Sequence, residues 1–369
     1  MQSSHQIAIT SPAGEPKDPR TWSGTPSNIA KELESLGIEV FGISSELKKY
    51  QKLTYRLIHQ LSGLGSAQSR GRLARTHSGN IVQSKSKDFN CHKILHTGTL
   101  DIPLSKTDAD FEHYLFCDTT WNLWTQYATN IDCYPPKAIQ LSEELEEKSY
   151  AQVKHFFATS EYVRQNLINR YQIDSEKITV VGTGRGKIKP SIEPEKSEQQ
   201  ILFVAKERFE DKGGFLLLEG FKLAVQKNPS LKLIVVGQEK YQEFVGSIPN
   251  IIVKGFIPWN ELQDLFNCAT LFAMPALNEP WGIVYLEALA CQTPILGLKR
   301  NSLPDITCQG KYGFLVNEPD PESIAGAIIQ AFADPEGLKQ MGALGQKYCL
   351  EKYSWSKVAK EIAKVVFDI

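Results

Sequence analysis

The sequence lacks an excess of charge of either sign, and it lacks long apolar runs. Its 41 Lys and Arg residues almost balance its 42 Asp and Glu residues, so the 369-residue chain has a formal net charge of −1. This balance argues against a nucleic-acid partner, because nucleic-acid-binding proteins are usually basic. No apolar run reaches the length of about 18 residues that a transmembrane helix needs. The N-terminus shows no charged segment followed by an apolar run, so no signal peptide is expected.

Cysteine pairs with a metal-binding or redox spacing are also missing. The seven cysteines are scattered and form no C-x-x-C motif. Cys91 and His92 lie near His96, but no second ligand pair has a suitable spacing, so a zinc site is not expected. We interpret the cysteines as reduced thiols of a cytoplasmic protein.

What the sequence does contain is an alternation of short apolar strands with helices, which is clearest in its second half. The strands are predicted at 199–205, 231–237, 251–257, 270–276, 293–299 and 313–316, and the intervening helices include 215–228, 261–269 and 322–334. This alternation predicts a parallel sheet that is covered on both faces. Such doubly wound domains bind ligands at the carboxyl ends of their strands.

The first half carries a weaker version of the same pattern. Strands are predicted at 6–10, 38–44, 113–119, 155–160 and 177–182, and helices at 25–37 and 161–172. After Gly182 the sequence G-T-G-R-G leads into a segment rich in Lys, Pro and Glu. Because no helical pattern follows these glycines, a linker is favoured over a dinucleotide-binding loop.

We therefore predict an α/β protein with two doubly wound, Rossmann-like domains that face each other across a cleft. The first domain covers residues 1–184 and the second covers 198–353. The C-terminal helix, 354–369, is expected to pack back on the first domain. A cleft between two sets of strand ends would suit two substrates held face to face.

The stretch MPALNEPWGIVYLEALACQTPI, at 274–295, carries two carboxylates in an apolar setting. We expect Glu279 to lie in the loop after the strand, and the helix to begin near Trp281 or Gly282. Glu287 then lies about 7–8 Å along that helix, at a rise of about 1.5 Å per residue. A helix cap and a surface residue would be the plain alternative, but the apolar neighbours of Glu287 make it a poor surface residue.

The start of this helix offers an anion site between the two carboxylates. The amides of Gly282, Ile283 and Val284 would have no intrahelical partner, and the helix dipole would assist anion binding. Carboxylates repel phosphate but accept paired hydrogen bonds from vicinal hydroxyls. The arrangement matches a nucleotide sugar, with Glu287 on the ribose, the amides on the diphosphate and Glu279 on the transferred sugar.

A bound diphosphate also needs cations, and the segment FVAKERFEDKGG at 203–214 supplies them in a turn between strand and helix. Its candidates are three basic residues and a glycine pair that permits close backbone approach, namely Lys206, Arg208, Lys212, Gly213 and Gly214. The only Asp-x-Asp sequence, at 108–110, precedes a predicted strand instead of following one. We therefore expect no metal and no cofactor beyond the donor substrate.

These residues carry a resemblance to a known family. The sequence resembles the family-4 retaining glycosyltransferases of GT-B fold, whose E-x7-E motif matches 279–287. Lys212-Gly213-Gly214 matches the phosphate-binding lysine loop of that family, and YGFLV at 312–316 matches a further signature. WSGTP at 22–26 is similar to the family's glycine loop, which implies that Gly24 lies beside the donor. The resemblance covers the second half well and the first half loosely.

The sequence departs from the family at two positions of interest. Glu207 stands where the family usually has an arginine, and Arg208 or Lys206 would substitute for it. Asp118 stands where a histidine is often found. These departures bear on the contacts to the sugar and on the identity of the donor.

The resemblance implies transfer of a hexose from a nucleotide diphosphate sugar to a hydroxyl of a glycan, a lipid-linked acceptor or a small molecule. Lys212, Arg208 and the helix amides would stabilise the leaving diphosphate, and Glu279 would orient the sugar. Two alternatives stay open, namely a nucleotide-sugar epimerase and a nucleotide-sugar-binding protein without turnover.

The segment 46–93 is locally basic, with ten Lys and Arg residues against two acidic ones. It would suit an anionic lipid surface or a phosphorylated acceptor, which predicts peripheral contact with the inner face of a membrane. A solvated, partly mobile loop is the plain alternative.

Overall fold

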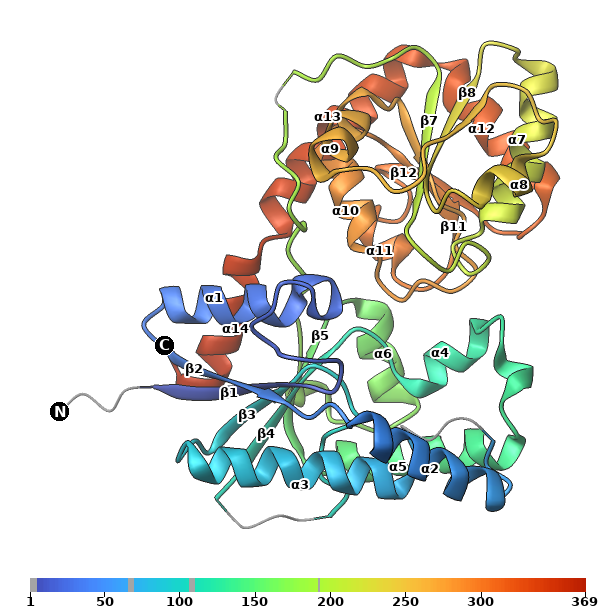
Figure 1. Cartoon of the computed structure of the whole chain (residues 1–369). Coiled ribbons are helices and arrows are strands. Elements are labelled where there is room, and N and C mark those ends of the chain that lie inside the picture. Colours follow the sequence, from blue (N-terminus) through green and yellow to red (C-terminus); the bar gives the residue numbers. More distant parts are fainter. Residues whose placement is uncertain (1–4, 66–69, 106–109, 192) are drawn as a thin grey trace. The chain divides into compact units, whose positions relative to one another are not determined.

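The computed structural model describes residues 5–65, 70–105, 110–191 and 193–369. The chain divides into two compact units (Figure 1). The first unit comprises Met1–Gln126, Asn130–Thr183 and Trp355–Ile369, and the second comprises Tyr127–Thr129 and Gly184–Ser354. Each unit is a six-stranded parallel sheet with flanking helices, which confirms the predicted α/β class and its two doubly wound domains.

The sheet of the first unit has the strand order β2-β1-β3-β4-β5-β6. Its strands are β1 (Gln6–Ser11), β2 (Glu39–Ser44), β3 (Lys93–His96), β4 (Glu112–Cys117), β5 (Val153–Ala158) and β6 (Ile178–Val180). The prediction found five of these strands and missed β3, which is only four residues long and is bounded by basic and polar residues. Strand β3 pairs with β1 on one side and with β4 on the other.

The helices of the first unit include two in the basic segment that the plain alternative treated as a loop. The two are α2 (Lys49–Leu61) and α3 (Arg72–Asp88). The other helices of the first unit are α1 (Thr25–Ser35), α4 (Trp121–Tyr127), α5 (Pro136–Tyr150), α6 (Glu161–Asn169) and α14 (Trp355–Phe367). That alternative is wrong for α2 and α3, while residues 66–69 of the segment lie outside the described ranges. Helix α14 packs on α1 through a stripe of apolar residues at helical spacing (Figure 1).

The sheet of the second unit has the strand order β12-β11-β10-β7-β8-β9. Its strands are β7 (Gln200–Ala205), β8 (Lys232–Gly237), β9 (Ile251–Val253), β10 (Leu271–Ala273), β11 (Ile295–Leu298) and β12 (Gly313–Val316). The sequence of strands runs outward from β7 to β9 and then resumes on the other side of β7 at β10. Neighbours β7 and β10 therefore mark the point at which the topology switches direction.

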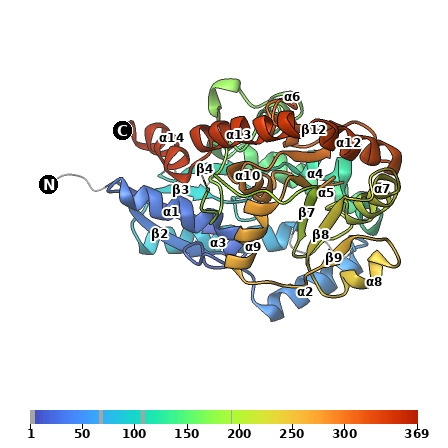
Figure 2. The ribbon, with the colours of Figure 1, turned by 90° about the horizontal axis from the view of Figure 1, so that it is seen from above.

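Helices cover this second sheet, and α7 and α12 lie side by side against it (Figures 1 and 2). The helices of the unit are α7 (Gly214–Lys227), α8 (Tyr241–Val245), α9 (Trp259–Cys268), α10 (Ile283–Ala290), α11 (Leu303–Ile306), α12 (Pro321–Ala333) and α13 (Pro335–Lys352). Apolar residues of the strands and of the inward helix faces form one continuous core. Among the described residues, no helix has both the length and the apolar character that crossing a bilayer requires.

Candidate functional site

Two of the predicted site residues meet at the topological switch point of the second unit. The loop after β7 carries Lys212, and the loop after the neighbouring strand β10 carries Glu279. The Lys212 Nζ donates a hydrogen bond to Glu279 Oε2 over 3.0 Å, and the two side chains are 18% and 16% exposed. Switch points are where doubly wound domains bind their ligands. The structure thus places an accessible ion pair where a ligand is expected.

Gly213 lets these two loops touch. Its φ of +74° is left-handed, and a Cβ atom on it would lie 1.9 Å from the carbonyl oxygen of Pro275. The Asp211 carbonyl also accepts hydrogen bonds from the amides of residues 277 and 278, at 2.7 and 3.0 Å. Lys212 stands between Asp211 and Gly213 and is therefore held at both sides. The close approach predicted for Gly213 is, in this structure, an approach to the neighbouring loop.

Helix α10 begins immediately after the loop that carries Glu279. Gly282 is its N-cap residue, with a left-handed φ of +77°, and a Cβ atom there would lie 2.7 Å from the ring of Tyr285. The amide of Tyr285 donates to the carbonyl of Gly282 over 2.9 Å. The amides of Gly282, Ile283 and Val284 precede this first intrahelical bond, as an anion site at a helix N-terminus requires.

Glu287 lies on α10, and residues 186 and 187, at the start of the second unit, contact its carboxylate. The backbone amide of Lys187 donates a hydrogen bond to its carboxylate. Gly186 has a left-handed φ of +66°, and a Cβ atom on it would lie 2.3 Å from Glu287 Oε1, so a larger residue there would be strained and would displace the carboxylate. Removal from water raises the pKa of Glu287 to about 7, against the opposing effects of the Lys212 charge and the Lys187 amide.

The sequence analysis missed this contact. It treated the glycines of G-T-G-R-G as a linker, whereas the structure uses Gly186 to cover Glu287. The adjacent Arg185 anchors the segment, because its guanidinium donates to the carbonyl of Tyr353 over 2.7 Å. The glycine spacing was the available signal, but only the tertiary structure shows which carboxylate it approaches.

Arg208 already has protein partners in the structure. Its Nε donates to Asp211 Oδ2 over 2.7 Å, and its Nη2 donates to the carbonyl of Asn278 over 2.9 Å. Arg208 thereby ties the loop after β7 to the loop after β10. Lys206 and Glu207 are exposed at the end of β7. The role of Arg208 as a phosphate ligand stays a prediction, since it would require these contacts to be shared or exchanged.

Gly24 lies in the first unit, as the left-handed N-cap residue of α1. The preceding Trp22 and Ser23 also have positive φ values, 43° and 55°. Three successive left-handed residues make the tight turn that brings the chain from β1 into α1. The donor-side role of Gly24 stays a prediction.

Metal-ligating side chains do not gather in the described ranges, where no group of three or more His, Cys, Asp or Glu residues could hold an ion. Asp108, the first residue of the Asp-x-Asp sequence, lies outside those ranges. Asp118 follows β4 directly and is partly exposed. The absence of a metal from the site stays a prediction.

The first unit contains a buried polar network that the sequence analysis did not anticipate. His96 Nδ1 lies 2.8 Å from Asp101 Oδ1, and His96 Nε2 lies 3.0 Å from His113 Nδ1. The Ser45 hydroxyl donates to the other Asp101 oxygen over 2.6 Å. Burial, together with the nearby His96, lowers the pKa of His113 to about 3. Since His96 and Asp101 have no exposed side-chain surface, we interpret the network as structural.

Arg75 is the second buried group of the first unit. Its side chain has no exposed surface, and its Nη2 lies 3.7 Å from Glu146 Oε2. Its Nη1 also donates to the carbonyls of Thr99 and Leu145 and to the Ser149 hydroxyl, at 3.1–3.3 Å. Burial lowers the pKa of Arg75 to about 10, and the Glu146 charge opposes that shift. Arg75 belongs to the basic segment, yet it is unavailable to any external anion.

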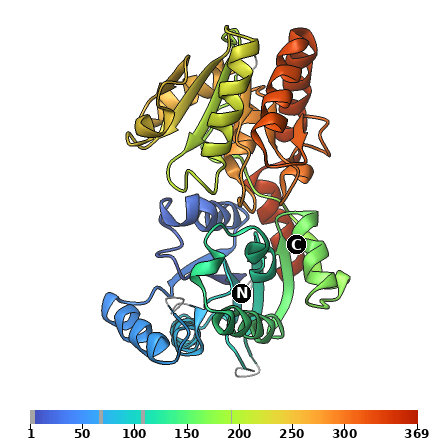
Figure 3. The ribbon, with the colours of Figure 1, turned by 90° about the vertical axis from the view of Figure 1, so that its right-hand side faces the viewer.

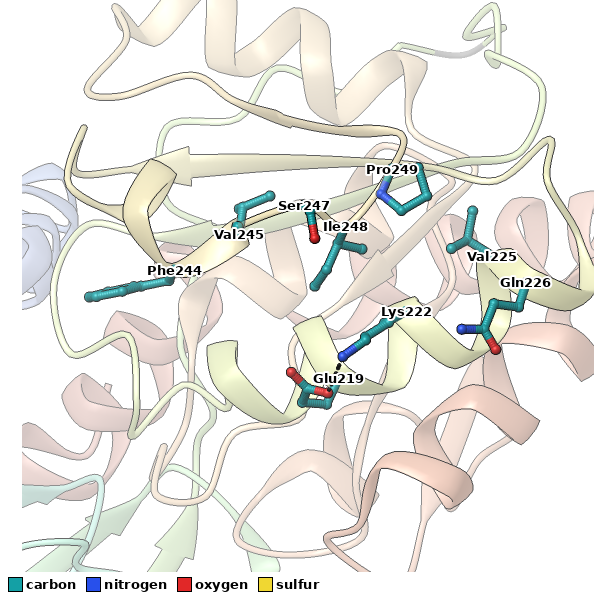
Figure 4. Close-up of a pocket in the computed structure, with 10 residues that line it drawn as sticks. Glu219, Lys222, Val225, Gln226, Phe244, Val245, Ser247, Ile248 and Pro249 are labelled. Atoms are coloured by element: carbon teal, nitrogen blue, oxygen red, sulfur yellow. Dashed lines mark ion pairs between the residues drawn. The ribbon is translucent and has the colours of Figure 1, made fainter.

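A separate cavity of about 460 Å³ lies between α7 and the residues that follow α8 (Figure 4). Figure 4 shows Phe244, Val245 and Ile248 opposite the exposed Glu219–Lys222 ion pair, whose atoms are 3.5 Å apart. None of the ten residues that line this cavity is a predicted site residue. We therefore do not assign the cavity to the candidate site.

Several curated proteins are similar to part of this chain. A D-inositol 3-phosphate glycosyltransferase of Segniliparus rotundus is 28% identical over 233 residues, which cover 57% of this chain and 51% of that protein. An alpha-maltose-1-phosphate synthase of Mycolicibacterium smegmatis is 29% identical over 119 residues, which cover 31% of each chain. The alignments span less than two thirds of the length of these relatives.

Comparison with solved structures covers nearly the whole chain. A sucrose-phosphate synthase from Thermosynechococcus elongatus has a TM-score of 0.75 at 16% identity, with 98% of both chains covered. WaaG, a glycosyltransferase involved in lipopolysaccharide biosynthesis, has a TM-score of 0.68 at 16% identity, with 98% of this chain and 99% of WaaG covered. At these identities the likeness concerns the fold.

The model of one protein family matches the region that holds the candidate site. The family is described as "Glycosyl transferases group 1", and the match extends over residues 185–365. This region contains Lys212, Glu279 and Glu287, together with the segment that covers Glu287. Residues 185–365 thus match the group 1 glycosyl transferases, and the two doubly wound units have the GT-B fold of the solved glycosyltransferases.

Proposed function

We propose that the protein is a retaining glycosyltransferase that moves a hexose from a nucleotide diphosphate sugar to an acceptor hydroxyl. The observation that carries the proposal is the Lys212–Glu279 pair at the β7–β10 switch point, beside the first amides of α10. Glu287 lies on the same helix. Lys212 and the amides suit the diphosphate of such a donor. Of the two carboxylates, Glu279 suits the sugar and Glu287 suits the ribose.

In this mechanism the protein mainly stabilises the leaving diphosphate. Lys212 and the amides at the start of α10 neutralise the negative charge that develops as the bond to the sugar breaks. An oxygen of the diphosphate takes the proton of the acceptor hydroxyl on the same face of the sugar, which preserves the anomeric configuration. Glu279 orients the sugar and stabilises its developing positive charge, and Glu287 binds the ribose hydroxyls.

Donor binding changes the partner of Lys212. In the structure its ammonium contacts Glu279 at 3.0 Å, so the free site already contains one negative charge opposite the lysine. The diphosphate adds further negative charge, which Lys212 must share with Glu279. We propose that the site works without a divalent ion, with Lys206 or Arg208 as additional cations.

The relatives support the coarse donor and acceptor classes. One structural neighbour at 14% identity, HepE of Anabaena, is described in complex with UDP and glucose, with a TM-score of 0.65. Curated relatives include an enzyme named as GDP-mannose-dependent and others named for inositol phosphate or maltose phosphate. We propose a hydroxylated glycan, lipid-linked or small acceptor on this basis.

A second candidate is a nucleotide-sugar-binding protein without turnover. It is favoured by Glu207 in place of the usual arginine, and by the engagement of Arg208 with Asp211 and Asn278. The third alternative, a nucleotide-sugar epimerase, requires an acid and a base at a sugar carbon, and the described residues offer no assigned pair.

The test is to incubate the purified chain with UDP-glucose or GDP-mannose, with and without hydroxylated acceptors, and to follow the sugar by NMR. A glycosyltransferase yields a glycoside with the anomeric configuration of the donor and releases nucleotide diphosphate. Inversion of the anomeric carbon would contradict the retaining mechanism. An acceptor-independent change of the sugar would indicate an epimerase, and binding without product would indicate a non-catalytic protein. Saturating donor should also raise the melting temperature, since a ligand at about 100 times its Kd adds about 2.7 kcal/mol.

A further inference from the structure

Helix α2 of the first unit exposes large apolar side chains along one stripe. Tyr50, Leu53, Leu57 and Leu61 are 63%, 59%, 53% and 90% exposed. At about 100° per residue, these four positions lie within about 80° of one another around the helix. Figures 1 and 3 show α2 at the outer edge of its unit. The stripe is therefore a continuous apolar surface in contact with solvent.

The polar residues of α2 make its contacts with the rest of the unit. Gln51 Nε2 lies 2.8 Å from His77 Nε2 of α3, and the ring of Tyr55 lies 6.3 Å from the same imidazole. His59 is buried against Gly71, where a Cβ atom would lie 1.8 Å from His59 Nε2. An ordinary surface helix buries its apolar face and exposes its polar face. Helix α2 does the opposite, so its apolar stripe is not core-facing.

Positive charge accompanies the stripe. Lys49, Lys52 and Arg56 are exposed along one flank of α2, and the thirteen residues of the helix include no acidic one. Of these three cations, only Lys52 has an ion pair within the described ranges, with its Nζ 2.8 Å from Glu46 Oε1. An apolar stripe with cations at its side is the composition of a helix that lies in the interface of an anionic membrane.

We propose that α2 docks the protein on an anionic lipid surface, with its apolar stripe among the acyl chains and its three cations at the phosphates. A second copy of the chain fits this face less well. The helix is 13 residues long, or about 20 Å, and it would bury far less than the roughly 800 Å² per partner of a stable dimer. An antiparallel symmetric pairing would also bring the cationic flanks of two copies together.

The proposal is independent of the proposed transferase activity, and vesicle flotation tests it. The chain should float with vesicles of phosphatidylcholine and phosphatidylglycerol, and at least about tenfold less with phosphatidylcholine alone, because each cation near an anionic surface adds attraction. The double variant Leu53→Ser/Leu57→Ser should reduce flotation by about tenfold or more. The triple variant Lys49→Glu/Lys52→Glu/Arg56→Glu should abolish the preference for anionic vesicles.

Leu344→Ser is the matched control, because Leu344 on α13 is also exposed, at 54%. It should bind vesicles as the unchanged chain does, and circular dichroism should confirm that all variants fold. Equal flotation of the unchanged chain and the double variant would overturn the proposal, as would absence of flotation with anionic vesicles. Sedimentation that shows a dimer dissociated by Leu53→Ser/Leu57→Ser would instead identify a self-association face. Donor binding in the absence of vesicles should be the same in all variants, which separates this proposal from the transferase activity.

Discussion

The two units differ in how deeply they bury their charged side chains. In the first unit, Arg75 and Glu146 are 0% and 2% exposed, and His96 and Asp101 are fully buried. Among the described residues of the second unit no charged side chain is buried to this degree, and Lys212 and Glu279 lie in the loops after β7 and β10 with 18% and 16% of their side chains exposed. Both units are doubly wound, so the fold alone does not decide where charge is placed.

The difference separates charges that hold a structure from charges that can meet a ligand. A fully buried ion pair pays a large desolvation cost, and its partners depend on each other once the chain is folded. A partly exposed pair at a switch point keeps access to water and can exchange its partner for a phosphate. We therefore expect variants in the first unit to change stability, and variants in the second to change binding and turnover.

Arg75→Ala should have the largest effect, and it should fall on stability. The variant leaves Glu146 buried without its cation, which typically costs about 3–5 kcal/mol. Urea unfolding measures the loss. The control is Arg170→Ala, because Arg170 is 41% exposed and pairs with Glu143 and Glu147 at the surface, where ion pairs contribute about 0–1 kcal/mol. Similar losses for the two variants would erase the distinction between buried and exposed pairs.

Lys212→Ala should have the next largest effect, on catalysis and not on folding. We expect kcat/KM to fall by at least about 100-fold, which corresponds to about 2.7 kcal/mol of transition-state stabilisation. The urea midpoint should stay near that of the unchanged chain. Activity should also survive EDTA. Inactivation by EDTA that Mg²⁺ reverses, together with a mild effect of Lys212→Ala, would refute the lysine-and-amide mechanism.

The two glutamates should respond differently to substitution. Glu287→Ala should weaken the binding of free nucleotide diphosphate by about tenfold, as expected for a lost hydrogen bond to a charged group of about 1.5 kcal/mol. Glu279→Gln should leave that affinity near normal and lower kcat, because the sugar is absent from free nucleotide. Calorimetry and initial rates measure the two quantities. Normal nucleotide affinity in Glu287→Ala would remove it from the ribose.

The smallest expected effect concerns pH and Glu287. Its folded pKa of about 7 lies above the ordinary glutamate value of 4.5, so the folded state holds the proton more tightly than the unfolded state. The free energy of unfolding should therefore fall as pH rises from about 4.5 to about 7. Glu287→Gln has no such proton, so its stability relative to the unchanged chain should rise across this range. A constant difference between pH 5 and pH 8 would contradict the shift.

Most of the second unit was predictable from sequence because strands such as β8, β10 and β11 are buried on both faces and read as continuous apolar runs. The same logic predicted that Lys212 and Glu279 lie in loops after such runs, and the structure places them in the loops after β7 and β10. Strand β3 was missed because four residues give too short a pattern. The contact of Gly186 with Glu287 was missed because it joins residues about a hundred positions apart, which no local pattern records.

The basic segment of the first unit shows a different limit. Counting its charges treated Arg75 as a surface cation, whereas the structure buries it completely. Conversely, the spacing of Tyr50, Leu53, Leu57 and Leu61 was present in the sequence but was outweighed by the surrounding charge. Composition describes what a segment contains, and only packing decides which of its residues face solvent.

The position of α14 has a consequence for the order in which the chain is made. Helix α14 packs on α1, yet Gly184–Ser354 of the second unit stand between the two in sequence. On the ribosome, domains usually fold from the N-terminus onward. Here the first unit is complete only once residues 355–367 have been synthesised, because their apolar stripe covers α1. By then the whole of the second unit has been synthesised. The second unit therefore has its complete set of elements synthesised before the first does, and a chain truncated after residue 354 would hold all of the second unit but a first unit whose α1 lacks its covering helix.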